Sequence, residues 1–309
     1  NYIVLEDCFS AEVAHEWVED ACQQTGVDLK DSATWPQPHC YLGQHMTKIK
    51  ELPLSQFSPK LWEVICQLVG GEERIQQPFT VNNTFVVNFS LGSDQPWTEP
   101  IEREGGWHVD GDFNQFIDSP EAGLFILMLF TEGELHGGAT YIAPDSIAHI
   151  LGHFLHHPQG LSAYHLRTSH NVAQQCNVGT PALGKAGTVY LMYPQMLHTT
   201  SQNLLRKPRL IRNGQVRLKS PMRFDRSRRE DLSAVERCAL RNLELGRIEF
   251  LPSSEGLRMA TDHDDGQLLP WKYGDCLLYT SPSPRDQRGS GVAAEGCKKK
   301  KGGGGGGGG

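Results

Sequence analysis

Two histidines and an aspartate have the residue types and the spacing of an iron site. His108 and Asp110 lie two residues apart in the sequence GGWHVDG, and His198 follows 90 residues after His108. Residues two apart on an extended strand point to the same face, so His108 and Asp110 can reach one metal ion. Two histidines and one carboxylate on one face of octahedral Fe(II) leave three positions open, the arrangement that non-haem oxygenases use. The three residues are therefore predicted to bind Fe(II).

A His-x-Asp pair is weak evidence by itself, and the sequence contains a second one at His263 and Asp265. The second pair has no strand pattern around it, and no histidine follows it in the chain. The pair at His108 has both a strand pattern and a histidine downstream, so we favour it.

An arginine with a suitable position follows the distal histidine. Arg209 comes eleven residues after His198, at the start of a predicted strand. Its planar guanidinium could bind a carboxylate through two parallel hydrogen bonds, which would suit a dicarboxylate co-substrate. Arg206 and Arg212 lie close by, and either could take this role if the strand register differs.

Three motifs taken together resemble the phytanoyl-CoA dioxygenase-like family of Fe(II)/2-oxoglutarate oxygenases. The motifs are WHVDGD from residue 107, GGATYIAPDSIAH from residue 137 and HTTSQNLLRKPR from residue 198, and the resemblance spans about 80–219. It implies a mainly β fold with flanking helices, built on a double-stranded β-helix core of the jelly-roll, cupin-like type.

The resemblance also implies roles for individual residues. His108, Asp110 and His198 resemble the iron ligands, and Arg209 resembles the residue that binds the distal carboxylate of 2-oxoglutarate. Thr200 matches a hydroxyl position two residues after the distal histidine. Asn88, on the strand before the His-x-Asp motif, is expected to make a polar contact to the co-substrate.

The function implied by the resemblance is a dioxygenase reaction. Fe(II), 2-oxoglutarate and O2 would together hydroxylate a C–H bond of a small organic substrate, with release of succinate and CO2. The sequence does not identify that substrate. Two alternatives stay open: a catalytically silent barrel of the same fold that binds a metal or a metabolite, and a zinc hydrolase that uses the same three ligands and a bound water.

A rival metal site could be formed by histidines four residues apart. His149, His153 and His157 would line one face of a helix and could hold zinc. No carboxylate accompanies them, and the apolar residues between them are typical of a short packing helix. We therefore favour a structural role for this segment.

The segment 206–229 is basic in an otherwise acidic chain. It holds ten Lys or Arg residues and one acidic residue, Asp225. Such a run is usually a solvated face. Alternatively, it could attract an anionic substrate that carries phosphate or resembles an acyl-CoA.

The expected elements begin with helices and continue with short strands. Ser10 is expected to cap a helix over 11–24 that ends at Gly26, and Ser58 with Pro59 begins a second helix that ends at Gly70. Asn213-Gly214 predicts a two-residue hairpin between strands 209–212 and 215–219. Further strands are expected at 84–89, 124–130, 139–143 and 188–192, and a last helix at 230–245.

Together with the resemblance, this order of elements predicts one oxygenase domain over 1–274. Its parts are a helical N-terminal region (about 1–75), a β core (about 80–220) and a C-terminal helical extension (about 226–274). Residues 275–309 end in four lysines and eight glycines, and the stretch DCLLYTSPSPRDQRGS resembles a translated sequencing adaptor. We expect this tail to be non-native.

Composition excludes several classes of protein. The 309 residues are 38% hydrophobic and 21% charged, as in a folded globular protein, and the net charge is −7. Without residues 275–309, 23 of the 29 basic and 33 of the 36 acidic residues remain, a net charge of −10 that argues against general nucleic-acid binding. No apolar run is long enough to span a membrane. The six cysteines before residue 275 show no CxxC spacing, which predicts reduced thiols in an intracellular, cytoplasmic protein.

Overall fold

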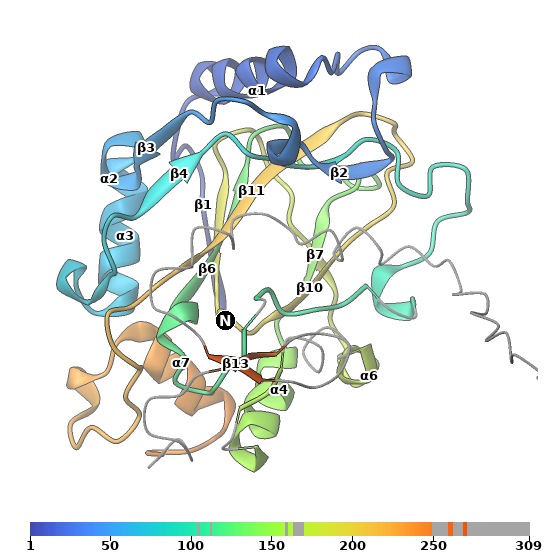
Figure 1. Cartoon of the computed structure of the whole chain (residues 1–309). Coiled ribbons are helices and arrows are strands. Elements are labelled where there is room, and N and C mark those ends of the chain that lie inside the picture. Colours follow the sequence, from blue (N-terminus) through green and yellow to red (C-terminus); the bar gives the residue numbers. More distant parts are fainter. Residues whose placement is uncertain are drawn as a thin grey trace, which may run out of the picture.

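A computed structural model describes residues 1–103, 106–111, 113–157, 160–162, 170–248, 259–261 and 268–270 (Figure 1). The predicted non-native tail, the second His-x-Asp pair and most of the predicted C-terminal extension beyond 248 lie outside these residues.

The structure is mainly β, and its strand pairs are antiparallel. The larger sheet has six strands in the order β1 (Tyr2–Leu5), β9 (Val189–Met192), β6 (Leu124–Leu129), β11 (Arg209–Val216), β5 (Val86–Asn88) and β2 (His39–Tyr41). The smaller sheet has the order β10 (Leu197–Thr200), β7 (Thr140–Ala143) and β8 (Thr180–Pro181). Two further pairs are β3 (Glu51–Pro53) with β4 (Thr80–Asn82), and β12 (Met259–Thr261) with β13 (Leu268–Pro270).

The two main sheets face each other. Figure 1 shows β1, β6 and β11 on one side of the molecule and β7 and β10 on the other. The ring of Phe125 on β6 lies 4.9 Å from the ring of His198 on β10, measured between centroids. Strand β6 is buried along its whole length because it is central in its sheet and covered on both faces, which explains its continuous apolar sequence LFILML.

The helices lie around the sheets. They are α1 (Ala11–Thr25), α2 (Leu54–Phe57), α3 (Pro59–Val69), α4 (Ser146–His156), α6 (His170–Ala173) and α7 (Ala234–Asn242). Trp17 of α1 contacts the rings of Phe57 and Phe130, at centroid distances of 4.6 and 6.1 Å, so α1 packs on the larger sheet where β6 ends. One cluster of buried apolar side chains extends from Cys8 to Ile248.

Two predicted helices are confirmed together with their ends. The Ser10 hydroxyl accepts a hydrogen bond from the Val13 amide, and Gly26 ends α1 with φ +70°. The Ser58 hydroxyl caps α3, which has Pro59 in its first turn and ends at Gly70. The last helix, predicted at 230–245, is shorter: α7 begins after Ser233, whose capping box with Glu236 fixes its start.

The hairpin predicted at Asn213-Gly214 is wrong. Both residues are extended within the continuous strand β11, where Asn213 pairs with Leu127 and Gly214 with Ile126. Pairing with β6 over this stretch replaces the local turn. The N-terminal region, predicted to be helical, also supplies β1 and β2 to the two edges of the larger sheet.

Among the described residues, no helix combines the length and the apolar character that a membrane crossing needs.

Candidate metal centre

His108 and His198 lie directly opposite each other across an antiparallel bridge. The amide of each residue donates a hydrogen bond to the carbonyl of the other, both at 3.0 Å. Their rings are 4.4 Å apart between centroids, at an interplanar angle of 52°. The β-pairing therefore brings together two histidines that are 90 residues apart in the sequence.

Backbone carbonyls orient both imidazoles. Nδ1 of His108 lies 2.8 Å from the carbonyl oxygen of Gly106, and Nδ1 of His198 lies 3.2 Å from that of Met196. A carbonyl oxygen only accepts a hydrogen bond, so each Nδ1 acts as a donor, which leaves Nε2 of each ring as the atom that can bind a metal. Nε2 of His198 is buried and has no hydrogen-bond partner within the described chain.

Asp110 completes the group, and its two carboxylate oxygens have different neighbours. Oδ1 lies 3.3 Å from Nε2 of His108 and 3.6 Å from Nε2 of His198, while Oδ2 accepts a hydrogen bond of 2.9 Å from Nδ2 of Asn213 on β11. Burial would raise the pKa of Asp110, but attraction to the protonated forms of His198 and His108 outweighs it and holds the pKa below its usual range. Asp110 is therefore an anion at neutral pH, as a metal ligand must be.

The donor set fits Fe(II). One ligand atom from each of His108, Asp110 and His198 lies within 4.8 Å of the others, and among the described residues this is the group arranged to hold a metal ion. Two imidazole nitrogens and one carboxylate oxygen match the ligands of non-haem Fe(II) oxygenases. The rival histidines do not form such a group: His149, His153 and His157 lie on or just after α4, where the rings of His153 and His157 are 6.1 Å apart between centroids.

Arg209 is a buried cation whose end groups have no partner. The residue is 1% exposed, and its Nε donates a hydrogen bond of 2.7 Å to the carbonyl of Gly138. Nη1 and Nη2 are buried without a hydrogen-bond partner in the described chain. Burial lowers the pKa of Arg209 to about 9, so it stays charged at neutral pH. Such a group fits an incoming carboxylate.

The neighbouring arginines are placed differently. Arg206 is exposed. Arg212 is buried, but its Nε donates to Oδ1 of Asn82 at 3.0 Å and its Nη1 donates to the carbonyl of Asn213. The unpartnered guanidinium nitrogens at Arg209 therefore favour it among the three candidates.

Asn88 and Thr200 lie beside these residues. Asn88 pairs with Arg209 between β5 and β11, but its amide is used on the backbone: Nδ2 donates to the carbonyl of Ser201 at 2.9 Å, and Oδ1 accepts from the amide of Leu91 at 3.1 Å. Thr200 lies two residues after His198 on β10, opposite Thr140 on β7. Alternation along β10 therefore puts Thr200 and His198 on the same face.

Much of the predicted basic segment is buried or ion-paired. Arg209 and Arg212 are inside the protein. Lys207 pairs with Glu134, Arg223 pairs with Asp225, and Arg228 pairs with Glu230. These five residues do not form an open cationic surface.

Comparison with protein-family models and with curated proteins gives no match. Solved structures give distant likenesses. The non-heme alpha ketoglutarate dependent carbocyclase SnoK from nogalamycin biosynthesis is 12% identical, over 70% of this chain and 79% of that chain, with a TM-score of 0.38. EctD from S. alaskensis with bound Fe is 20% identical, over 71% and 75%, with a TM-score of 0.36. A Pseudomonas putida prolyl-4-hydroxylase is 10% identical, over 71% and 93%, with a TM-score of 0.36.

Three site residues were not predicted from the sequence. Asn213 supports Asp110, and the wrong hairpin prediction concealed it, although Asn213 lies four residues after Arg209 and so on the same face of an extended strand. His39 and Thr140 each have a buried side-chain atom, Nε2 and Oγ1, without a hydrogen-bond partner in the described chain. No motif marks either residue.

Proposed function

We propose that this chain is an Fe(II)- and 2-oxoglutarate-dependent dioxygenase that hydroxylates a C–H bond of a small organic substrate. Its core would be a double-stranded β-helix within a single oxygenase domain over 1–274. The observation that carries the proposal is the buried, unpartnered guanidinium end of Arg209, in a mainly β structure that also holds a His-Asp-His group. A zinc hydrolase that activates water needs the three ligands but does not require a buried cation of this kind.

The three ligands would hold Fe(II), and Arg209 would hold the distal carboxylate of 2-oxoglutarate. Together, the iron and the co-substrate supply the oxidation of a C–H bond by O2, with 2-oxoglutarate converted to succinate and CO2. The protein contributes position and charge. Arg209 and Asn213 point to the same face of β11, about 13 Å apart along the strand. One strand therefore supports both the carboxylate site and, through Asp110, the iron site.

The surroundings of the ligands would keep the site rigid. Trp107 and Val109, on either side of His108, are fully buried. The ring of Phe125 lies against His198. Packing of this kind fixes side-chain rotamers. A low-dielectric surrounding strengthens the charge interactions of the buried Arg209.

The proposal predicts that the protein converts 2-oxoglutarate to succinate in air when Fe(II) is present. The test measures succinate with and without a panel of small organic acids, thioesters and amino-acid derivatives, using His198→Ala as the inactive control. We expect Fe(II)-dependent succinate that rises with a productive substrate and is absent in the variant. Equal succinate from both proteins, or none from the wild type with any addition, would contradict the proposal.

A further inference from the structure

His39 lies in the same row of side chains as Arg209. On the larger sheet, His39 of β2 pairs with Asn88 of β5, and Asn88 pairs in turn with Arg209 of β11. Directly paired residues of antiparallel strands have their side chains on one face, with Cβ atoms about 5 Å apart. His39 and Arg209 are therefore on the same face, with Asn88 between them.

The side chain of Asn88 makes no hydrogen bond to the side chains of His39 and Arg209 on either side of it. Its amide is bound to backbone atoms of Ser201 and Leu91. Gly138 shows how tightly Asn88 is held: a Cβ at this glycine, which has φ +77°, would come within 2.4 Å of Nδ2 of Asn88. Asn88 thus separates the two side chains without satisfying them.

Both ends of the row carry buried polar atoms without a partner. Nε2 of His39 and both terminal nitrogens of Arg209 have no hydrogen-bond partner in the described chain. Buried polar groups are nearly always paired, so a cluster of such atoms indicates a place for a ligand. Arg209 supplies a cation there, and a neutral imidazole with its proton on Nε2 supplies a donor. Two donors on one face of the sheet, from the strands on either side of β5, suit the oxygens of a carboxylate.

The electrostatics agree with this geometry. Burial, together with the charges of Arg209 and His108, lowers the pKa of His39 to about 4. His39 is therefore close enough to Arg209 to sense its charge, and it is neutral at pH 7.

We propose that His39 is a second co-substrate-binding residue, whose Nε2–H donates a hydrogen bond to the distal carboxylate that Arg209 binds. This inference rests on the proposed function, because it takes 2-oxoglutarate as the ligand. It adds a residue from the N-terminal part of the chain, outside the three motifs, to the co-substrate pocket.

The test compares two ligands that differ at the distal carboxylate. Dissociation constants of 2-oxoglutarate and of 2-oxopentanoate, which lacks that carboxylate, are measured anaerobically on the Fe(II)-loaded protein from the visible charge-transfer band. His39→Phe keeps a ring and removes the donor, and His45→Phe, at an exposed histidine, is the matched control. We expect His39→Phe to raise the dissociation constant of 2-oxoglutarate about tenfold, as for the loss of one charge-assisted hydrogen bond. The dissociation constant of 2-oxopentanoate should stay within about twofold of its wild-type value, and the control variant should change neither constant.

Two further variants separate a binding role from a structural one. His39→Gln keeps an N–H donor and is expected to restore much of the selectivity for 2-oxoglutarate. Should the Phe variant fail to fold, His39→Leu is measured with the same two ligands.

Equal weakening of both ligands, or no weakening of 2-oxoglutarate, would overturn the role of His39. A wild-type protein that binds iron but shows no band with 2-oxoglutarate would instead overturn the proposed function.

Discussion

Asn213 donates a hydrogen bond of 2.9 Å from Nδ2 to Oδ2 of Asp110, and this contact leaves Oδ1 directed at the two histidines. A ligand carboxylate that is held in this way presents one oxygen to the metal. Residues that orient a metal ligand typically contribute 10- to 100-fold to metal affinity.

Asn213→Ala is therefore expected to weaken Fe(II) binding about 10- to 100-fold, because Asp110 loses the contact that fixes its orientation. Competition with a chromogenic chelator under anaerobic conditions measures the affinity. Asn177→Ala, at an exposed asparagine, serves as the control. Wild-type affinity in the Asn213 variant would mean that Asp110 needs no such support.

Arg209→Lys should weaken the binding of 2-oxoglutarate at least tenfold, because an ammonium group cannot reproduce the two parallel hydrogen bonds of a guanidinium. Iron affinity should be unchanged, because the structure shows no contact between Arg209 and the three metal ligands. Isothermal titration of the iron-loaded protein with 2-oxoglutarate provides the measurement. Arg206→Lys is the matched control, and loss of binding in that variant alone would move the carboxylate site to Arg206.

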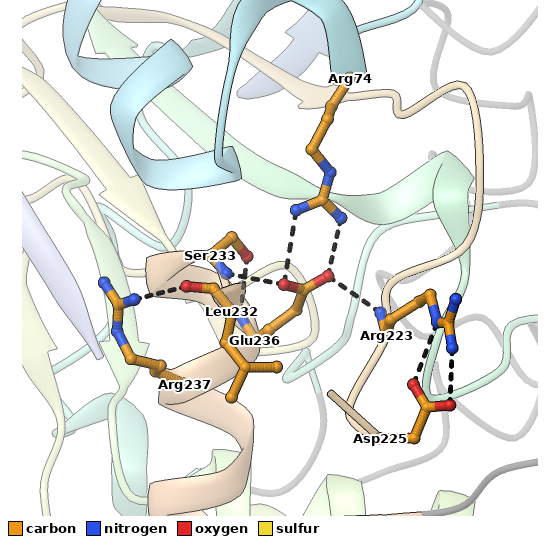
Figure 2. Close-up of polar contacts among 7 residues, drawn as sticks. All are labelled: Arg74, Arg223, Asp225, Leu232, Ser233, Glu236 and Arg237. Carbon is orange, nitrogen blue, oxygen red and sulfur yellow. Dashed lines mark hydrogen bonds and ion pairs between the residues drawn. The ribbon is translucent and has the colours of Figure 1, made fainter. Parts of the chain in front are cut away.

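Arg74→Ala should lower the free energy of unfolding by about 3–5 kcal/mol, because it leaves Glu236 as an unpaired buried charge. Nη2 of Arg74 lies 2.7 Å from Oε1 of Glu236, whose side chain is fully buried (Figure 2). Glu236 also accepts hydrogen bonds from the amides of Arg223 and Ser233 (Figure 2). Urea unfolding measures the change.

The control for this variant is Arg223→Ala, which removes the ion pair with Asp225 and should lower the free energy of unfolding much less, because Arg223 is 60% exposed. Similar losses in both variants would show that burial of Glu236 does not decide the effect.

In the iron-free protein, the free energy of unfolding should decrease as the pH is lowered from about 6.5 to 4, in part through protonation of His39. Burial, helped by the charges of Arg209 and His108, lowers the pKa of His39 in the folded state to about 4, while an unfolded histidine titrates near 6.5. Below pH 6.5 His39 binds a proton in the unfolded state but not in the folded state. This difference favours unfolding by up to roughly 3 kcal/mol at pH 4. Urea unfolding at several pH values should show that the free energy of unfolding decreases less steeply with acidification in His39→Gln than in the wild type. Parallel pH dependences of the two proteins would contradict this assignment.

The parts of the fold that depend on local sequence were predictable. Ser10 with Gly26, and Ser58 with Gly70, determine their helix ends through contacts within a few residues, and both helices are found. Asn213-Gly214 shows the limit of local reasoning. It is a strong turn signal, but pairing of this stretch with β6 keeps it extended.

The candidate site was predictable only where a motif marks it. His108, Asp110, His198 and Arg209 come from motifs, and the structure brings the first three together. Asn213 contacts Asp110, and His39 lies in the same row as Arg209, because of the registers of β2, β5 and β11, which are set by pairing between distant segments. The unpartnered state of the Arg209 guanidinium depends on what surrounds it, and the sequence does not carry that information.

The central claim is that the protein holds Fe(II) on His108, Asp110 and His198 and 2-oxoglutarate on Arg209. The most direct test is anaerobic addition of Fe(II) and then 2-oxoglutarate, followed by visible absorption spectroscopy. We predict a metal-to-ligand charge-transfer band in the wild type, no band in His198→Ala, and a band that needs much more 2-oxoglutarate in Arg209→Lys. Folded wild-type protein that binds Fe(II) but gives no band at any 2-oxoglutarate concentration would contradict the claim.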